Sequence, residues 1–380
     1  MMETCMDSYF TTFTTYWQMW EYHTKKAAES QWERRMVKDL SVAPLDRSSV
    51  LATTPGGFAA GISERAVEDT EDNLGLALMV GHQYYPVRST AYKTLLERAK
   101  ISGTTLAKLK KKDLAGILNT CLKIHSAQAL LLIRDEKVTA VHAGDEHDYS
   151  VLPANKLLEA LQEKLDGRFP GNSFKGGYAD HAITSASWEL PGQKDELIGT
   201  YTKALEAAGQ ETDAENAVPG IRFMTSDTGA SAAKVCALLS CRGLPVHIGS
   251  CISVEHRRKA KVGDFQAGLD QLFAQFGKSM EKLEGLLHIS LDYPANAMSR
   301  ICKKLSLPKK AAVEAISMFE MANGDAPATA HDVFMAMQEI PYILRTEGTP
   351  QAKMLSVEES MARALSLKWK DYDLAKGADY

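Results

Sequence analysis

The clearest pattern of hydrophobic and polar positions lies in the middle of the chain. Residues 220–226, 232–239 and 246–256 are short segments rich in apolar and β-branched residues, and turns with polar residues or glycine separate them. This pattern predicts a meander of three antiparallel strands. Residues 262–287 follow with apolar side chains at steps of mostly three and four, which predicts one long amphipathic helix. Because the helix and one face of the meander each need an apolar partner, we expect them to bury each other.

Shorter patterns precede the meander. Residues 95–122 carry apolar residues at helical intervals, interrupted by turns, and predict three small helices. Two apolar runs within residues 129–142 flank a polar Asp-Glu pair and predict a β-hairpin. Residues 154–165 predict a helix, residues 178–190 a strand, and the acidic residues 206–218 an exposed loop. With the meander, these elements predict an α+β fold built on small antiparallel sheets.

Three regions follow one another along the chain. Residues 1–85 are expected to form an N-terminal lead-in, partly irregular, in which the charged residues 21–40 are compatible with a helix and the acidic residues 64–72 are solvated. Residues 86–290 form the central α+β region. Residues 291–380 show helical periodicity interrupted by Pro, Gly and Asp, and they predict a helical C-terminal region.

The composition is that of an ordinary globular protein. Of the 380 residues, 45% are hydrophobic and 24% are charged, which excludes a disordered chain and a collagen-like repeat. Lys and Arg number 44 against 48 Asp and Glu, so the net charge of -4 excludes a global polycation but not a local basic groove. No run approaches the roughly 18 apolar residues of a membrane span, and Glu3 and Asp7 lie where a signal peptide is basic. We expect a cytoplasmic protein with no membrane partner.

Six cysteines are scattered along the chain without a Cys-x-x-Cys pair, so we do not expect a disulfide framework. One group combines cysteine with histidine and comprises Cys236, Cys241, His247, Cys251 and His256. Zinc sites prefer ligand pairs about two to four residues apart, and the spacings here are looser. We therefore expect reduced thiols packed in the sheet, with neither a metal ion nor another cofactor.

Motifs of the common enzyme classes are scarce. The chain has no GxxxxGK[ST], GxGxxG, HExxH or GxSxG sequence. Strand alternation places His247, Cys251, Ser253 and Glu255 on one face. Such a face is either simply exposed to solvent or holds a catalytic nucleophile together with its base. The sequence therefore favours a non-enzymatic protein and assigns no catalytic residue.

Basic residues gather in three short segments of the chain. A phosphate backbone needs several such charges along one groove, because each contact displaces condensed counterions. The alternative for each segment is a solvated helix end. From the first two segments, the residues expected to contact phosphate are Lys110, Lys111, Lys112, Arg257, Arg258, Lys259 and Lys261. The third segment holds Arg300, Lys303, Lys304, Lys309 and Lys310.

Several short segments between residues 95 and 360 follow one another along the chain in an order found in other proteins. They are Leu95–Ile101, Leu114–Leu122, Leu132–Arg134, Tyr149–Leu152, Thr225–Ser231, Ala330–Phe334 and Glu358–Ser360. In this order they resemble a family of uncharacterised proteins carried by phages, prophages and plasmids. The resemblance implies a mobile genetic element in a bacterial cytosol and supplies no catalytic residue.

The strand-strand-strand-helix order of residues 220–287 is also similar to the core of phage single-strand annealing proteins. The second basic segment lies at its strand-to-helix junction, where backbone N–H groups favour phosphate. Residues 93–122 are compatible with a helix-turn-helix as an alternative. We therefore expect a nucleic-acid-binding protein of a phage or plasmid, acting on single strands or annealing them.

The main alternative is a protein-interaction module of a mobile element, such as an inhibitor of host defence. The aromatic residues near the N-terminus are its candidate surface, namely Tyr16, Trp17, Met19 and Trp20. The sequence does not decide between a host protein partner and nucleic acid, nor whether the chain forms a homo-oligomer.

Overall fold

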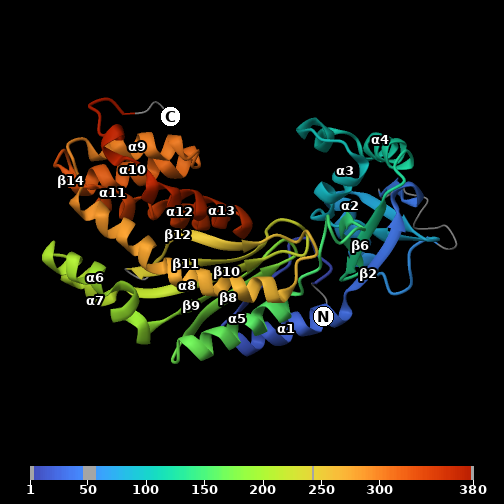
Figure 1. Cartoon of the computed structure of the whole chain (residues 1–380). Helices are drawn as coiled ribbons and strands as arrows, with labels where there is room; N and C mark the ends of the chain where they lie inside the picture. Colours follow the sequence, from blue (N-terminus) through green and yellow to red (C-terminus); the bar gives the residue numbers. More distant parts are fainter. Residues whose placement is uncertain (1–3, 46–56, 242–243, 378–380) are drawn as a thin grey trace.

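The computed structural model describes residues 4–45, 57–241 and 244–377. These residues form two lobes (Figure 1): a larger lobe that holds one broad sheet and a smaller lobe drawn mainly in blue and teal. The larger sheet is antiparallel and has the strand order β1-β8-β9-β10-β11-β12. Its strands are β1 (Phe10–Phe13), β8 (Ser173–Asp180), β9 (Thr184–Glu189), β10 (Val218–Thr225), β11 (Ala233–Cys241) and β12 (Leu244–Val254).

The predicted meander and its helix are confirmed. β10, β11 and β12 pair in chain order, with Ile221 opposite Ala237 and Val235 opposite Ile252. Helix α8 (Val262–Gly285) follows them and packs against β11 and β12. The apolar stripe of α8 lies in the main hydrophobic core together with alternate residues of these strands. Each large side chain buried here contributes about 1.5–3 kcal/mol, so the contact between α8 and the sheet stabilises the larger lobe strongly.

Helices cover both faces of the six-stranded sheet (Figure 1). On one face α8 packs beside α5 (Ala154–Arg168), and α5 in turn contacts α1 (Tyr16–Glu29). On the opposite face α13 (Gln351–Ala362) contacts β12, and its Leu355 packs with Met224 of β10. The other C-terminal helices confirm the predicted helical region. They are α9 (Pro294–Lys304), α10 (Lys309–Asn323), α11 (Ala330–Ala336) and α12 (Glu339–Thr346).

The smaller lobe contains two antiparallel sheets. The predicted hairpin is β6 with β7, and β2 extends it in the order β2-β6-β7. The other sheet has the order β3-β4-β5, and Leu78, Leu95, Leu118 and Leu131 share one core between the sheets and the helices. The strands are β2 (Gln31–Met36), β3 (Ser41–Pro44), β4 (Leu76–Val80), β5 (Gln83–Pro86), β6 (Gln128–Arg134) and β7 (Lys137–Ala143). The helices are α2 (Glu64–Asp72), α3 (Ala91–Ala99) and α4 (Lys111–Lys123), with a 3-10 turn at Thr104–Lys108 before α4.

The N-terminal region is more ordered than the predicted lead-in, although residues 46–56 lie outside the described residues. Helix α1 ends at Glu29, and the charged residues that follow form strand β2 instead of a continued helix. The backbone N–H and C=O groups along one edge of the apolar strand β6 need hydrogen-bond partners, and β2 supplies them. The acidic run 64–72 is helix α2 and not an irregular segment; its Glu64, Glu68 and Asp72 are exposed as expected, whereas Ala66, Asp69 and Thr70 are buried.

The acidic residues 206–218 are not the predicted loop. They include helix α7 (Glu211–Asn216), which packs against α6 (Lys194–Ala207) and buries Asp213 and Ala214. The local sequence is weakly apolar, and the packing partner that stabilises this short helix is provided by the tertiary fold.

The predicted strand over residues 178–190 is instead the end of β8 and the whole of β9. A tight turn separates β8 from β9. One carboxylate oxygen of Asp180 stabilises this turn by accepting hydrogen bonds from the backbone N–H groups of Ala182 and Ile183, both at 2.7 Å. Trp188 is buried in the core, as its strand position predicts.

The chain passes between the lobes at Ser30 and again in residues 144–153, between β7 and α5. The lobes therefore interleave along the sequence: β1 and α1 belong to the larger lobe, although they precede the smaller one. This division differs from the boundaries after residues 85 and 290 that the sequence suggests. Within the described ranges, no helix is long and apolar enough to cross a membrane.

Candidate nucleic-acid interface

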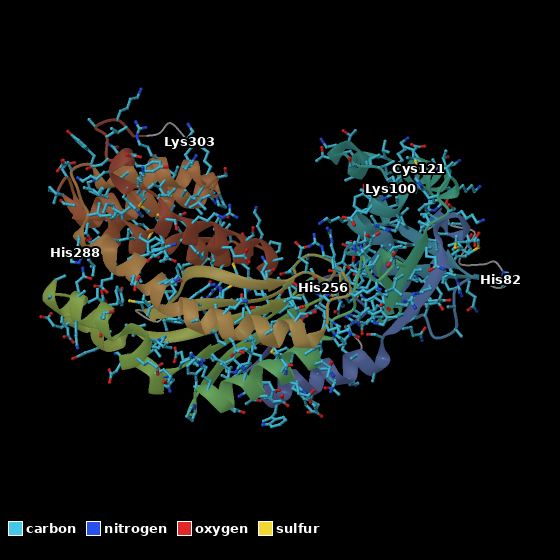
Figure 2. The ribbon with its side chains drawn as sticks, in the orientation of Figure 1. His82, Lys100, Cys121, His256, His288 and Lys303 are labelled. Atoms are coloured by element: carbon cyan, nitrogen blue, oxygen red, sulfur yellow. A yellow bond between two sulfur atoms is a disulfide. The ribbon has the colours of Figure 1, made fainter. Side chains whose placement is uncertain are left out.

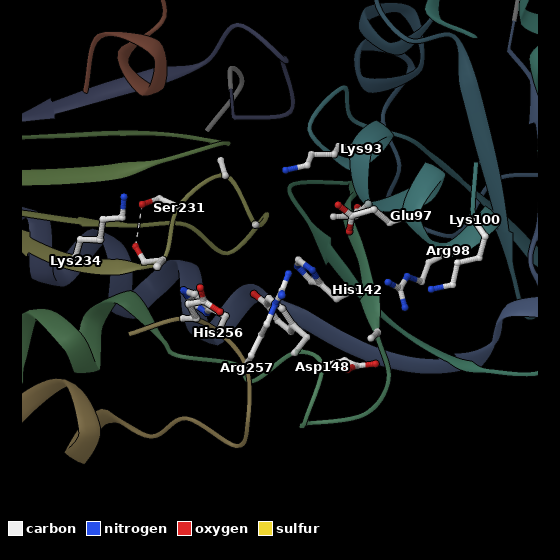
Figure 3. A pocket seen from close by; sticks show the side chains of 17 residues that line it. Lys93, Glu97, Arg98, Lys100, His142, Asp148, Ser231, Lys234, His256 and Arg257 are labelled. Atoms are coloured by element: carbon white, nitrogen blue, oxygen red, sulfur yellow. Dashed lines mark hydrogen bonds between the residues drawn. The ribbon is translucent and has the colours of Figure 1, made fainter. Parts of the chain in front are cut away.

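A cleft of about 560 Å³ lies where the two lobes meet. Lys93, Arg98 and Lys100 line it from α3 and the residue after α3, and Lys234 and Arg257 line it from the larger lobe (Figure 3). Lys100 ends α3 in the left-handed conformation, with φ at 55°, which turns the chain beside the cleft. The fold therefore brings five cationic side chains from both lobes to one hollow.

The cations outnumber the carboxylates in this cleft. Glu97, Asp148 and Glu255 also line it. Lys234 is paired, since its Nζ lies 2.9 Å from a carboxylate oxygen of Glu359. Among the described residues, the other lysines of the cleft and its Arg257 form no ion pair. Their positive charge is thus available to an anionic ligand.

Arg98 has a feature that distinguishes it from an ordinary surface arginine. Its Nε is buried and has no hydrogen-bond partner within the described part of the chain. Burial lowers the pKa of Arg98, although the charges of Glu97 and Asp148 oppose this. Arg98 lines the cleft, and its planar guanidinium group suits the recognition of phosphate or carboxylate oxygens.

A column of aromatic rings forms the floor of the cleft. The rings of His142 and Tyr149 are parallel within 5°, with centroids 3.5 Å apart. His256 stacks on the other side of Tyr149 at 5.6 Å, and Trp32 lies 6.2 Å from His142. His142, Tyr149 and His256 are buried, so their faces stack on one another and support the cleft.

Asp227, in the turn after β10, joins the two lobes beneath this column. Its carbonyl oxygen accepts hydrogen bonds from Nε2 of His142 at 2.7 Å and from the hydroxyl of Tyr149 at 3.1 Å. Its carboxylate accepts one from Arg134 of β6 at 2.8 Å. Burial raises the pKa of Asp227, but the charge and hydrogen bond of Arg134 outweigh burial and hold this pKa below its ordinary value. The carboxylate is therefore ionised at neutral pH and fixes β6 to the larger lobe.

The second basic segment lies at the edge of the cleft. Arg257 lines it, and the next two residues, Arg258 and Lys259, have φ values of 58° and 59°. Their backbone N–H groups donate to the carbonyl oxygens of His147 and Glu146 at 2.7 and 3.0 Å, which fixes this turn against the loop after β7. All the basic side chains of the segment, including Lys261, are exposed.

The other two basic segments do not reach the cleft. Lys110 and Lys112 are exposed at the start of α4, whereas the Nζ of Lys111 donates to the carbonyl oxygen of Glu71. The third segment lies on α9 and α10, and Figure 2 shows Lys303 on the larger lobe, away from Lys100 beside the cleft. Of the seven residues predicted to contact phosphate, the described cleft contains Arg257.

Sequence reasoning missed Lys93, Arg98, Lys100 and Lys234 because none of them belongs to a basic run. Lys93 and Lys100 are seven residues apart, a spacing that places two residues on one face of a helix, although Lys100 is the residue after α3. That spacing is a signal the sequence does contain. Lys234 is isolated in the sequence, and only the pairing of β11 places it opposite α3.

The expectation of reduced thiols is wrong for Cys236 and Cys251, which form a disulfide. They lie directly opposite each other in β11 and β12, with Cα atoms 4.2 Å apart, so strand register brings their sulfur atoms together. Cys251 is therefore not a free nucleophile in this form, although His247 Nε2 lies 3.4 Å from its sulfur. Cys241 is buried in β11, as predicted, and is not part of this disulfide.

The buried histidines make stability depend on pH. Burial lowers the pKa of His142 to about 4 and that of His23 and His247 to about 3, from an ordinary 6.5. Between about pH 6.5 and about pH 4 the unfolded chain therefore binds protons that the folded chain does not, and stability falls as pH falls. Each pKa unit corresponds to about 1.4 kcal/mol per histidine. We expect urea denaturation to give a lower midpoint at about pH 5 than at about pH 7.

A variant of an exposed histidine, His288→Gln, is the control, and it is expected to keep the same pH dependence. Equal midpoints at the two pH values for the wild-type protein would contradict the assignment of neutral, buried imidazoles.

Comparisons with known proteins give no match, whether to a family model, to a curated protein or to a solved structure. The function must therefore be argued from the cleft itself. Cationic side chains outnumber carboxylates in its lining, which suits it to binding an anion.

Proposed function

We propose that the protein is a non-enzymatic nucleic-acid-binding protein of a phage or plasmid, and that it holds a single strand in the cleft between its lobes. The observation that carries the proposal is the convergence of Lys93, Arg98 and Lys100 from one lobe with Lys234 and Arg257 from the other. Charges that approach from two sides suit a phosphate backbone running between them, because each phosphate then has a cation within reach.

The exposed basic turn extends this path beyond the cleft. Arg257 lines the cleft, and Arg258, Lys259 and Lys261 follow on the surface beside a second, shallow hollow of about 370 Å³. A single nucleic-acid strand that leaves the cleft would meet these positive charges one after another. The buried aromatic column is not available for stacking with bases, so contacts to the backbone, independent of base sequence, account for the binding.

The test is a salt titration of binding to a labelled single-stranded oligonucleotide, followed by fluorescence anisotropy. The triple variant Lys93→Ala, Lys100→Ala, Arg257→Ala is expected to bind more weakly. The slope of log K against log salt is expected to be shallower by about 2, since each lost contact to a single strand removes about 0.7. The matched control removes three exposed lysines from other helices, Lys203, Lys278 and Lys304, and so makes the same change in net charge.

The control variant is expected to keep the wild-type slope, which separates the cleft from the general field of the protein. Replacement of Lys110 and Lys112 by Ala tests the remaining exposed residues of the first basic segment in the same assay. Absence of binding by the wild-type protein at low salt, or equal losses in the two triple variants, would overturn the proposal.

The second candidate function is a protein-interaction module, which an exposed aromatic patch favours. Trp17 is 69% exposed and Phe10 is 60% exposed, and Trp17 contacts Trp20 edge to face at 5.8 Å. Met19 does not belong to this surface, because it is fully buried in the core. A protein that fails to bind oligonucleotide in the titration above would leave this patch as the better-supported site.

A further inference from the structure

Three metal-ligating side chains converge on the face of the six-stranded sheet that carries α13. They are Cys236 of β11 with His247 and Cys251 of β12, and one donor atom of each lies within 4.8 Å of the others. Cys236 and Cys251 are cross-strand partners. In a regular strand, residues four apart such as His247 and Cys251 are separated by about 13 Å. The register shift between Cys236 and Leu238 shortens this stretch of β12 relative to its partner and brings the imidazole to the sulfur atoms.

We propose that, when the disulfide is reduced, Cys236, His247 and Cys251 bind a zinc ion. Two thiolates and one imidazole are a set of ligands that zinc prefers. In a tetrahedral site with Zn–S of about 2.3 Å and Zn–N of about 2.0 Å, sulfur and nitrogen lie about 3.5 Å apart. The distance from His247 Nε2 to the sulfur of Cys251 is 3.4 Å. The ligands therefore need little rearrangement beyond separation of the sulfur atoms.

The state of His247 suits a ligand. The side chain is buried beside the two sulfur atoms, so the imidazole is already in position to coordinate an ion held by them. Its Nδ1 has no hydrogen-bond partner in the described part of the chain. The two nearby cations are already neutralised, since Arg222 pairs with Glu358 and Lys234 with Glu359.

The site is open on one side. His247 and Cys251 line a cavity of about 460 Å³ that also contacts α8, α13 and the turn after α13. Gly249 lets α8 approach at this point, because a Cβ there would collide with Ser279. Three protein ligands with a fourth position facing a cavity match zinc sites that keep an exchangeable ligand, and Lys282 at the cavity wall favours an anionic one.

Reduction must precede binding. A dithiol reductant transfers two electrons to the Cys236–Cys251 bond, closes into its own disulfide and leaves one proton on each released sulfur. Both protons leave when the ion binds the two thiolates. The oxidised and reduced proteins therefore differ in metal affinity while the rest of the chain is unchanged, and this comparison needs no variant.

Cobalt(II) is the spectroscopic probe for this site. The full-length protein is reduced with a dithiol, freed of it without oxygen, and titrated with Co²⁺. The expected result is a thiolate-to-cobalt charge-transfer band and tetrahedral ligand-field bands that saturate at one equivalent and disappear when Zn²⁺ is added. The untreated, disulfide-bonded protein is expected to show none of them. Reduced protein without these bands overturns the proposal.

Variants assign the ligands. Cys251→Ser and His247→Gln are expected to lose or shift the bands, whereas Cys121→Ser, which removes a free thiol on α4, is expected to retain them. A second measurement covers variants that fail to fold: Zn²⁺ is expected to protect Cys236 and Cys251 of the reduced wild-type protein from alkylation, with Cys121 as the unprotected internal control. Full bands in Cys251→Ser, or equal alkylation of all three cysteines, would overturn the assignment.

Discussion

The variant Lys137→Met is expected to have a free energy of unfolding about 3–5 kcal/mol below that of the wild-type protein. Lys137 is completely buried at the start of β7. Its Nζ lies 3.0 Å from Asp7 Oδ1 and also pairs with the carboxylate of Asp69. Methionine is similar in size but leaves both buried carboxylates without this cation. Arg88 remains near Asp7, at 3.5 Å, whereas Asp69 loses its cationic partner.

Denaturation by urea, followed by circular dichroism, measures this difference. Lys25→Met removes an exposed ion pair with Glu29 and is expected to change the free energy by less than about 1 kcal/mol. The double variant Lys137→Met, Asp69→Leu removes a buried charge together with its partner and is expected to recover much of the loss. A single variant as stable as the wild type, or a double variant less stable than the single one, would contradict this account.

Acid weakens the buried ion pairs that Asp7 forms with Lys137 and Arg88. Burial raises the pKa of Asp7, but hydrogen bonds from Ser89 and the charges of Lys137 and Arg88 outweigh burial, and the pKa lies below its ordinary value of 3.8. A depressed carboxyl pKa gives a contribution to stability that is complete above about pH 4 and is lost as the pH falls through the folded-state value. Below about pH 4 this loss therefore adds to the remaining effect of His23 and His247, whose folded-state pKa values are about 3.

The variant Asp227→Ala is expected to unfold with a free energy lower by about 3 kcal/mol and to loosen the contact between the lobes. The side chain of Arg134 is 9% exposed, and the variant leaves its guanidinium group without the carboxylate that pairs with it. The hydrogen bonds from His142 and Tyr149 go to the carbonyl oxygen of residue 227 and survive the substitution. The variant therefore isolates the contribution of the carboxylate.

Two measurements follow this variant: urea denaturation, and hydrogen exchange of the segment 144–153 that connects the lobes. Exchange there is expected to become faster, because the contact that holds β6 to the larger lobe is weakened. The control Asp270→Ala removes an exposed pair with Lys164 and is expected to change neither quantity. Unchanged stability together with unchanged exchange would show that Asp227 is not the link between the lobes.

Local patterns in the sequence were sufficient for the elements that carry their own periodicity. The meander, the long helix α8, the hairpin of β6 and β7, and helix α5 each have a buried face that is visible as a repeat of apolar residues. One residue of the cleft, Arg257, was found the same way because it stands in a run of basic residues. In these cases the information lies within about twenty consecutive residues, which is the range over which periodicity can be read.

Strand β2 and helices α2 and α7 were missed for the opposite reason. Their sequences are charged and weakly apolar, and each is stabilised by a surface contributed from a distant part of the chain. Lys137 is an extreme case: it follows a polar turn in the sequence, yet the fold surrounds it completely and pairs it with Asp7 and Asp69. Propensity cannot foresee such burial, because the compensating charges come from elsewhere in the sequence.

The sequence by itself therefore determined the class of the fold, the regular elements with a hydrophobic face and the presence of local basic runs. The tertiary structure alone decided which charges meet: it placed Lys93 and Lys100 opposite Lys234 and left the first basic segment outside the cleft. It also decided the state of Cys236 and Cys251, through the register of β11 and β12. The physical reason is that charge pairing, ligand geometry and disulfide formation depend on distances of a few ångströms between residues that the sequence separates, and only the packing of the elements sets those distances.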